Sequence, residues 1–409
     1  MNMMFRQAGP EDEGVGAIIK VIGVGGRGCF SVNSMAENEL LGVELIAANT
    51  DLKDLRAAKV KTTLQLGPTL AKGKGVGMKP ELGAKAAEES IEEIKELLRG
   101  CDMLFIATGL GGGTGTGASP VIAKASQEMG ILTVAVIGMP FKFEGAFKAR
   151  LAQEGWEKLR QYTDAIITLP NDRCLSQKGK DSIAEATGAM GKDVLMQAVQ
   201  AIADMVNMLG ELGNIDFNDV NTTMKDMGKA VIGVGRASGE NRVMEAAQKA
   251  IDNPLMDDSR IDGAKGLLLH IRGNVHDIAL EHFEKASEMI AVQCDTEVVS
   301  KFGISHDESL GNDVVVSVVA TGVGEQTNIH RPLAGGAGKG GETKGPGLGI
   351  GISDPIRIAK PRTPPIGPQV PSDFGDERPL SGSPKDRSGS IKIEDDDAVR
   401  PQYIMKVAN

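Results

Sequence analysis

A glycine-rich segment, TGLGGGTGTG at residues 108–117, constrains this chain more than any other feature. It follows an apolar run at 102–107 that is typical of a buried strand, and it precedes a segment at 118–129 with helical spacing. Five of the seven residues 111–117 are glycine. Each glycine loses more backbone entropy on folding than another residue would, and a turn with only a structural role does not need so many. Successive N–H groups of such a loop can surround an oxyanion. The segment therefore predicts phosphate binding at a strand-to-helix turn.

A second glycine loop, GVGGRG at 23–28, follows the apolar run at 17–22. It matches the GxGxxG pattern, and Asp51 follows the next apolar run, where a dehydrogenase would hold a ribose hydroxyl. A Rossmann-type oxidoreductase is therefore one hypothesis, although it leaves the loop at 108–117 unexplained. Two phosphate loops at neighbouring strand ends predict one di- or triphosphate at the carboxyl edge of a sheet.

Apolar and amphipathic segments alternate along the chain, which predicts an α/β fold. Short β-branched runs indicate buried strands, and the segments between them indicate helices, so we expect a mostly parallel sheet with helices on both faces. A long central helix is predicted over 182–211, followed by a smaller C-terminal α/β domain. The expected strands are 17–22, 43–48, 102–107, 131–138, 165–170, 264–271 and 313–320, and the other expected helices are 81–98, 118–129, 242–251 and 276–289.

Composition separates a globular body from a tail. The 409 residues are 41% hydrophobic and 24% charged, as in ordinary globular proteins, but 331–409 holds 11 of the 18 prolines. Such a segment cannot bury enough apolar area to offset its ordering entropy. The predicted organisation is a flexible N-terminus at 1–16, a nucleotide-binding domain at 17–181, the central helix at 182–211, a C-terminal domain at 212–322, a disordered linker at 323–398 and a tail peptide at 399–409.

Charge and residue types exclude several classes of function. The net charge of −10 and an aromatic content of 3% argue against a nucleic-acid partner. The chain contains neither an apolar stretch long enough to span a bilayer nor an apolar leader, so we expect a cytoplasmic protein without direct membrane insertion. Four cysteines without a CxxC pair predict reduced thiols rather than disulfides or a zinc site.

Both glycine loops, together with further motifs, resemble the tubulin/FtsZ family. The motifs occur in the family's order from about residue 17 to 322. The resemblance implies a polymerising GTPase that forms the cytokinetic filament ring in bacterial cell division, under the membrane at the division site. Its implied partners are further copies of itself, stacked head to tail, with GTP hydrolysed at the contact between subunits. The further motifs are NTD at 49–51, PFKFEG at 140–145, LPND at 169–172, NIDFND at 214–219 and VATG at 319–322.

The resemblance also implies a set of nucleotide-binding residues. The ligand is GTP or GDP, and any Mg²⁺ is expected to be held mainly by phosphates, so no protein metal ligand is named. A carboxylate at 144 and a cation at 148 would meet the ribose and phosphates, the alternative being a solvated turn. The implied set is Gly25, Gly26, Arg27, Gly28, Cys29, Asn49, Asp51, Gly112, Gly113, Thr114, Gly115, Thr116, Glu144, Lys148, Asn171 and Lys192.

Catalysis is assigned by the same resemblance to Asn214, Asp216 and Asp219. In the family this loop enters the nucleotide pocket of the next subunit. Carboxylates three residues apart at a helix start lie on one face, and near a γ-phosphate they can orient the attacking water. Within one chain the same two carboxylates would be ordinary helix caps.

Several positions depart from the family pattern. Gly188 stands where the family stacks a phenylalanine on the base, and Lys192 stands where an acceptor pairs with guanine. Lysine has no acceptor atom for the guanine donors. Phe30 replaces an asparagine and either supplies the missing stack or packs in the core. These changes support an alternative function, a divergent nucleotide-binding structural polymer with little or no hydrolysis and weak guanine selectivity.

The terminal residues PQYIMK at 401–406 are similar to the family's C-terminal peptide. That peptide docks on membrane-tethering division proteins such as FtsA, which are therefore the implied partners of the tail. Val399 and Arg400 stand where the family usually has Asp-Ile. On the residues alone, a frayed end is the alternative to a partner-binding peptide.

Overall fold

The computed structural model describes residues 16–40, 42–169, 196–208, 210–253, 261, 263–294 and 298–323. The first half of the described chain builds six parallel strands in the order β3-β2-β1-β4-β5-β6, and β6 continues into β8 as a further parallel pair. The prediction of an α/β fold with a mostly parallel sheet is therefore confirmed. These strands are β1 (Ile19–Val24), β2 (Glu44–Asn49), β3 (Thr62–Gln65), β4 (Met103–Gly109), β5 (Leu132–Gly138) and β6 (Ala165–Leu169).

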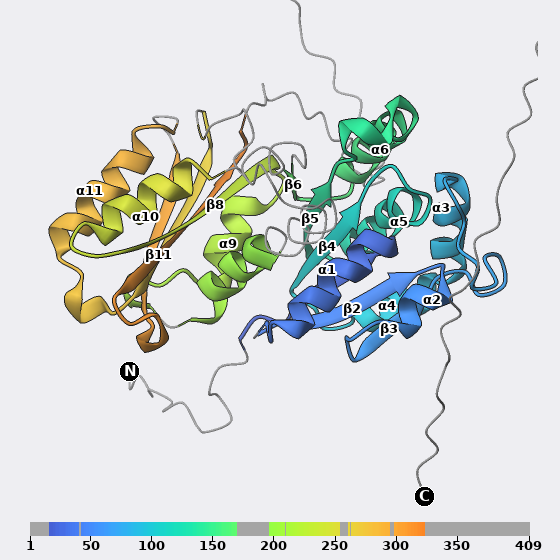
Figure 1. The fold of residues 1–409 in the computed structure, drawn as a ribbon, viewed down its shortest axis with the longest axis horizontal. Helices are drawn as coiled ribbons and strands as arrows, with labels where there is room; N and C mark the ends of the chain where they lie inside the picture. The colour runs from blue at the N-terminus through green and yellow to red at the C-terminus, as the bar shows by residue number, and fades with distance from the viewer. Residues whose placement is uncertain are drawn as a thin grey trace, which may run out of the picture. The chain divides into compact units, whose positions relative to one another are not determined.

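Helices cover both faces of this sheet, as predicted (Figure 1). Alternate residues of β4 belong to different cores: Phe105 packs with one and Ile106 with the other. Strands buried on both faces are apolar throughout, which explains the continuous apolar runs in the sequence. One core takes residues from α1 (Gly25–Glu37), α2 (Leu52–Arg56) and α9 (Phe217–Met224), and the other from α3 (Pro80–Glu89), α4 (Ile91–Leu98), α5 (Thr114–Glu128) and α6 (Ala146–Arg160).

The second half of the described chain extends the sheet in the order β8-β11-β9-β10-β7. β11 pairs antiparallel with both β8 and β9, whereas β9 and β10 are parallel. A third core lies between these strands and two helices (Figure 1). The elements are β7 (Gly210–Leu212), β8 (Gly228–Ser238), α10 (Arg242–Ile251), β9 (Gly266–Gly273), α11 (Leu280–Ala291), β10 (Val299–His306) and β11 (Asp313–Thr321).

The predicted central helix is described only in part. Residues 196–207 are helical, and Val199, Ile202 and Met205 are buried in the core that also contains α1. The remainder of the predicted 182–211 helix falls almost wholly outside the described residues, as do all but residue 16 of the predicted N-terminus, the linker after 323 and the tail peptide. Two predicted boundaries are wrong: helix ends at residue 207 and β7 begins at Gly210, so the central helix does not reach 211, and Val323 is buried in the third core, so the body extends past 322. The other boundaries of these segments stay predictions. No helix among the described residues is long and apolar enough to cross a membrane.

Candidate nucleotide site

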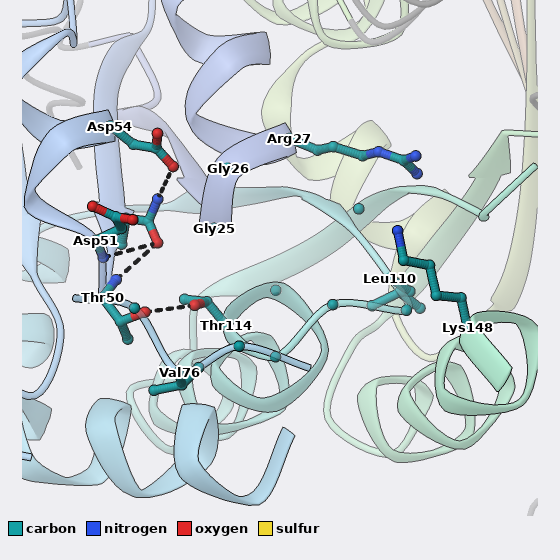
Figure 2. Close-up of a pocket in the computed structure, with 18 of the residues that line it drawn as sticks. Gly25, Gly26, Arg27, Thr50, Asp51, Asp54, Val76, Leu110, Thr114 and Lys148 are labelled. Carbon is teal, nitrogen blue, oxygen red and sulfur yellow. Dashed lines mark hydrogen bonds between the residues drawn. The ribbon is translucent and has the colours of Figure 1, made fainter. Parts of the chain in front are cut away.

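A cavity of about 390 Å³ opens at the carboxyl ends of β1, β2 and β4 (Figure 2). Both predicted glycine loops contribute to its wall, and η1 (Lys142–Glu144) and α6 close one side. The sheet edge predicted for phosphate binding is therefore where the chain forms a hollow. The lining residues are Gly25, Gly26, Arg27, Asn49, Thr50, Asp51, Asp54, Lys74, Gly75, Val76, Gly77, Gly109, Leu110, Gly111, Gly112, Gly113, Thr114, Gly115, Glu144 and Lys148.

The two glycine loops lie side by side because β1 and β4 are parallel neighbours. Their register pairs Val24 with Thr108, and the Thr108 Oγ1 hydroxyl donates to the Val24 carbonyl oxygen over 3.1 Å. Gly25 has a φ of +73°, and a Cβ there would lie 2.9 Å from the Gly115 nitrogen. Only glycine allows this approach, and it brings the starts of α1 and α5 to one cavity.

A third loop, GKGVG at residues 73–77, completes the wall and was not predicted. It contacts the glycine-rich loop at 108–117 closely: a Cβ on Gly113 would lie 2.0 Å from the Gly77 carbonyl oxygen. Lys74 forms an isolated backbone bridge with Asp51, which ties the loop to the end of β2. Glycines at 73, 75 and 77, all with positive φ, were a detectable signal, since alternating glycines are unusual outside turns.

Polar side chains after β2 fix the other side of the cavity. Asn49 Nδ2 donates to Asp54 Oδ2 over 2.8 Å, and Asn49 Oδ1 accepts from the Thr50 amide over 2.8 Å. The hydroxyls of Thr50 and Thr114 are 2.6 Å apart, which connects this segment to the glycine-rich loop (Figure 2). Asp51 caps α2 by accepting from the Lys53 amide over 2.9 Å. Asn49 and Asp51, both predicted nucleotide contacts, thus line the cavity and also order its wall.

Two of the three cations that line the cavity, Arg27 and Lys148, are bound to one carboxylate. Arg27 forms an ion pair with Glu144, and Lys148 Nζ lies 2.7 Å from Glu144 Oε2. Burial alone would raise the pKa of Glu144, but hydrogen bonds from Lys148 and Arg27 lower this pKa to about 2. The guanidinium of Arg27 also lies 5.7 Å from the centre of the Phe141 ring. Figure 2 shows Arg27 and Lys148 on one side of the glycine loops, with Asp51 and Asp54 on the other.

Three predicted contacts do not line the cavity. Cys29 is buried with Sγ 3.6 Å from the carbonyl oxygens of Gly23 and Ala48, and burial raises the pKa of its thiol to about 12. Thr116 Oγ1 accepts from the Gly111 amide over 2.8 Å, so this hydroxyl shapes the loop. A Cβ on the third, Gly28, would lie 2.4 Å from the carbonyl oxygen of Ala107, so this glycine allows α1 to pack on β4.

Other predicted positions are placed elsewhere or not described. Asn171 and Lys192 lie outside the described residues, as does Gly188. Phe30 lies on α1 and is 41% exposed, so it does not pack in the core. Whether it stacks on a base stays a prediction.

The acidic loop, defined here as residues 214–219, leads from β7 into α9. Asp216 caps α9: its Oδ1 accepts from the Asp219 amide over 2.8 Å, and Asp219 Oδ2 accepts from the Asp216 amide over 3.3 Å. Asn214 Oδ1 accepts from the Gly210 amide over 3.2 Å, and Asp219 Oδ1 lies 2.8 Å from Lys301 Nζ. Asn214, Asp216 and Asp219 are absent from the lining of the cavity. One chain therefore brings most of the predicted binding residues together and leaves the predicted catalytic residues apart from them.

Comparison with known proteins identifies relatives of both halves. Residues 18–178 match the GTPase domain of the Tubulin/FtsZ family, and residues 228–324 match the C-terminal domain of the FtsZ family. The chain is 46% identical to the cell division protein FtsZ of Pseudomonas aeruginosa over 317 residues, which are 78% of this chain and 79% of that protein. The corresponding protein of Azotobacter vinelandii is 44% identical over 317 residues, again 78% of this chain and 79% of that protein.

Solved structures give the same result for the fold. An FtsZ dimer from M. jannaschii is similar with a TM-score of 0.70 and 37% identity, over 77% of this chain and 92% of that chain. CetZ2 from Haloferax volcanii, a GTPγS-bound protofilament, has a TM-score of 0.65 at 23% identity, over 76% of this chain and 94% of that chain, and supports the fold alone.

Proposed function

The chain belongs to the FtsZ family of tubulin-like GTPases of cell division, and on that premise we propose that it hydrolyses GTP at the contact between subunits stacked head to tail. One observation carries the proposal: the cavity and the acidic loop are separate within one chain. A second copy that presents its acidic loop to the cavity completes the site. The oxidoreductase hypothesis is set aside, because the family match includes both glycine loops.

Phosphate binding rests on the backbone of the glycine loops. Residues at the starts of α1 and α5 line the cavity, and both helix N-termini favour a bound anion. Gly112 fits this role, because a Cβ there would meet no atom within 4 Å and the loop is open on its cavity side. Arg27 and Lys148 supply two cations that can turn from Glu144 to phosphate oxygens, and Glu144 can accept ribose hydroxyls.

Magnesium would be held mainly by the phosphates and water. The described residues contain no cluster of three His, Cys, Asp or Glu side chains suited to a metal. Mg²⁺ in nucleotide sites commonly takes most of its ligands from phosphates and water. Bound Mg²⁺ would neutralise charge on the β- and γ-phosphates. Two of the three carboxylates that line the cavity, Asp51 and Asp54, are available to orient its water ligands.

Hydrolysis in this proposal uses the acidic loop of the neighbouring subunit. Asp216 and Asp219 lie at the same end of α9, so their carboxylates approach the γ-phosphate together. A carboxylate there accepts a hydrogen bond from the attacking water and directs its lone pair at phosphorus. Asn214 supplies a side-chain amide beside them.

The test is phosphate release measured against protein concentration, with GTP and ATP side by side. A shared site predicts negligible turnover below a threshold concentration and constant turnover per assembled subunit above it. Specific activity that is independent of concentration would reject the shared site. Turnover near zero at every concentration, with filaments present, would favour the structural polymer suggested by Gly188 and Lys192.

A variant tests the guanine selectivity separately. Lys192→Asp should raise the preference for GTP over ATP, since an acceptor for the guanine donors is restored.

The tail extends the proposal to a location and a partner. We expect residues 399–409 to bind a membrane-tethering division protein such as FtsA and so bring filaments to the division site. If residues 323–398 form the predicted flexible linker, its root-mean-square span would be roughly 45–50 Å, enough to separate the filament from the partner. Deletion of 399–409 should leave assembly and GTP turnover intact and abolish recruitment to the division site. Normal localisation of the truncated protein would place the partner contact on the body.

A further inference from the structure

The acidic loop and the strand before it, β7, pack against strand β10. β7, which leads into the loop, pairs antiparallel with β10 through Leu212 and Ile304. A Cβ on Gly213 would lie 2.8 Å from the Phe302 carbonyl oxygen, and one on Gly303 would lie 3.0 Å from Ile215 Cγ1. The loop therefore packs directly on the backbone of β10, and the position of the strand sets the position of the loop.

The carboxylate of Asp219 is held at both oxygens. Oδ1 lies 2.8 Å from the ammonium of Lys301 on β10, and Oδ2 accepts from the Asp216 amide over 3.3 Å. The Asp219 side chain is only 16% exposed, whereas that of Lys301 is 50% exposed. A carboxylate offers about four acceptor positions, so two contacts fix its direction and leave room for a hydrogen bond from water.

The backbone at Lys301 is fixed by strand pairing, and the side chain carries a positive charge at neutral pH. β10 pairs in parallel with β9 along its whole length, from Val299–Gly266 to His306–Gly273, which fixes the backbone beneath Lys301. The hydrogen bond and charge of Asp219, with a further contribution from Asp216, raise the pKa of Lys301, so it stays protonated at neutral pH. Within the described chain, this cation and the helix cap thus act on the same carboxylate from two directions.

We propose that Lys301 is a positioning residue for GTP hydrolysis, whose ammonium holds the Asp219 carboxylate in the orientation in which it meets the attacking water in the neighbouring subunit. The inference rests on the proposed role of Asp219. Lys301 acts through that carboxylate and not on the nucleotide. Because the Lys301 side chain is 50% exposed, replacing it leaves no large hole in the core, and variants at this position are expected to fold.

The test compares Lys301→Met, which removes the charge and keeps the length, with Lys301→Arg, which keeps the charge. Lys285→Met is the matched control, because it breaks the exposed ion pair with Glu281 on α11, away from the acidic loop. Lys301→Met should lower turnover per assembled subunit about 10-fold, as misplacement of a reacting group does. The GTP affinity and the threshold concentration of Lys301→Met should match those of the wild type. Lys301→Arg should recover most of the lost turnover, and the Lys285→Met control should lose none.

A double-variant cycle separates positioning from a general structural role. If Lys301 acts only through Asp219, the Asp219→Asn/Lys301→Met protein should turn over GTP no more slowly than Asp219→Asn alone. An additive loss would overturn the inference, as would unchanged turnover in Lys301→Met or a loss explained by a higher threshold concentration. Unchanged turnover in Asp219→Asn alone would instead reject the proposed function of the acidic loop.

Discussion

The cavity and the acidic loop are held in place by different kinds of contact, backbone packing in the cavity and side-chain interactions in the loop. Three glycine-containing loops form the cavity, and their backbones approach so closely that a Cβ on Gly25 or Gly113 has no room. Side chains order the acidic loop, where the carboxylates of Asp216 and Asp219 accept from the cap of α9 and from Lys301. A backbone cavity can bind an anion in an isolated chain. Carboxylates that already have partners gain a catalytic role only through assembly with a second chain.

The largest expected effect is a loss of GTP turnover in Asp219→Asn without a loss of GTP affinity. Asp219→Asn should reduce GTP turnover by roughly two orders of magnitude or more, because it weakens the acceptor for the attacking water. GTP affinity of the unassembled subunit should not change, since Asp219 does not line the cavity. Equilibrium binding and steady-state phosphate release measure the two quantities. A matching loss of affinity would show that the two regions are not independent.

A smaller effect tests the backbone packing of the cavity. Gly113 has a φ of −80°, which alanine also adopts, so a side chain there is opposed by its contacts, 2.0 Å to the Gly77 carbonyl oxygen and 2.8 Å to Val76 Cγ2. Gly113→Ala should therefore lower the free energy of unfolding by about 2 kcal/mol. Gly112→Ala is the control and should change it by less than about 0.5 kcal/mol, since its Cβ meets open space. Denaturant unfolding without nucleotide compares them, and equal stabilities would contradict the packing argument.

The smallest effect concerns the ion pairs of Glu144. Its pKa is lowered from 4.5 to about 2, so the stability it adds is complete above pH 4.5 and is lost as pH falls toward 2. Arg27 and Lys148 are 42% and 36% exposed, which screens the pairs and limits the contribution to about 1 kcal/mol. Glu144→Gln should thus have a lower free energy of unfolding than the wild type at pH 7. This difference between the two proteins should be smaller at about pH 3.5. A difference that is unchanged with pH would mean that the charge is not the cause.

The sequence predicted the cavity better than the acidic loop because its signals are local. The run at 102–107 and the glycines after it specify β4, the turn and α5 within one short segment. β8 and β10 were missed, because their glycines and polar residues interrupt the apolar pattern. The pairing of Lys301 with Asp219 joins residues far apart in the sequence, and no local pattern indicates it.

Mixing two inactive proteins tests the central claim most directly. Gly112→Asp places a negative charge in open space within the cavity and should block nucleotide binding without a steric clash, while its acidic loop stays intact. Asp219→Asn keeps the cavity and loses the acidic loop. Phosphate release from each protein alone should be near background, whereas an equal mixture should recover activity at contacts between an intact cavity and an intact loop. A mixture no more active than its components would contradict hydrolysis across the subunit contact.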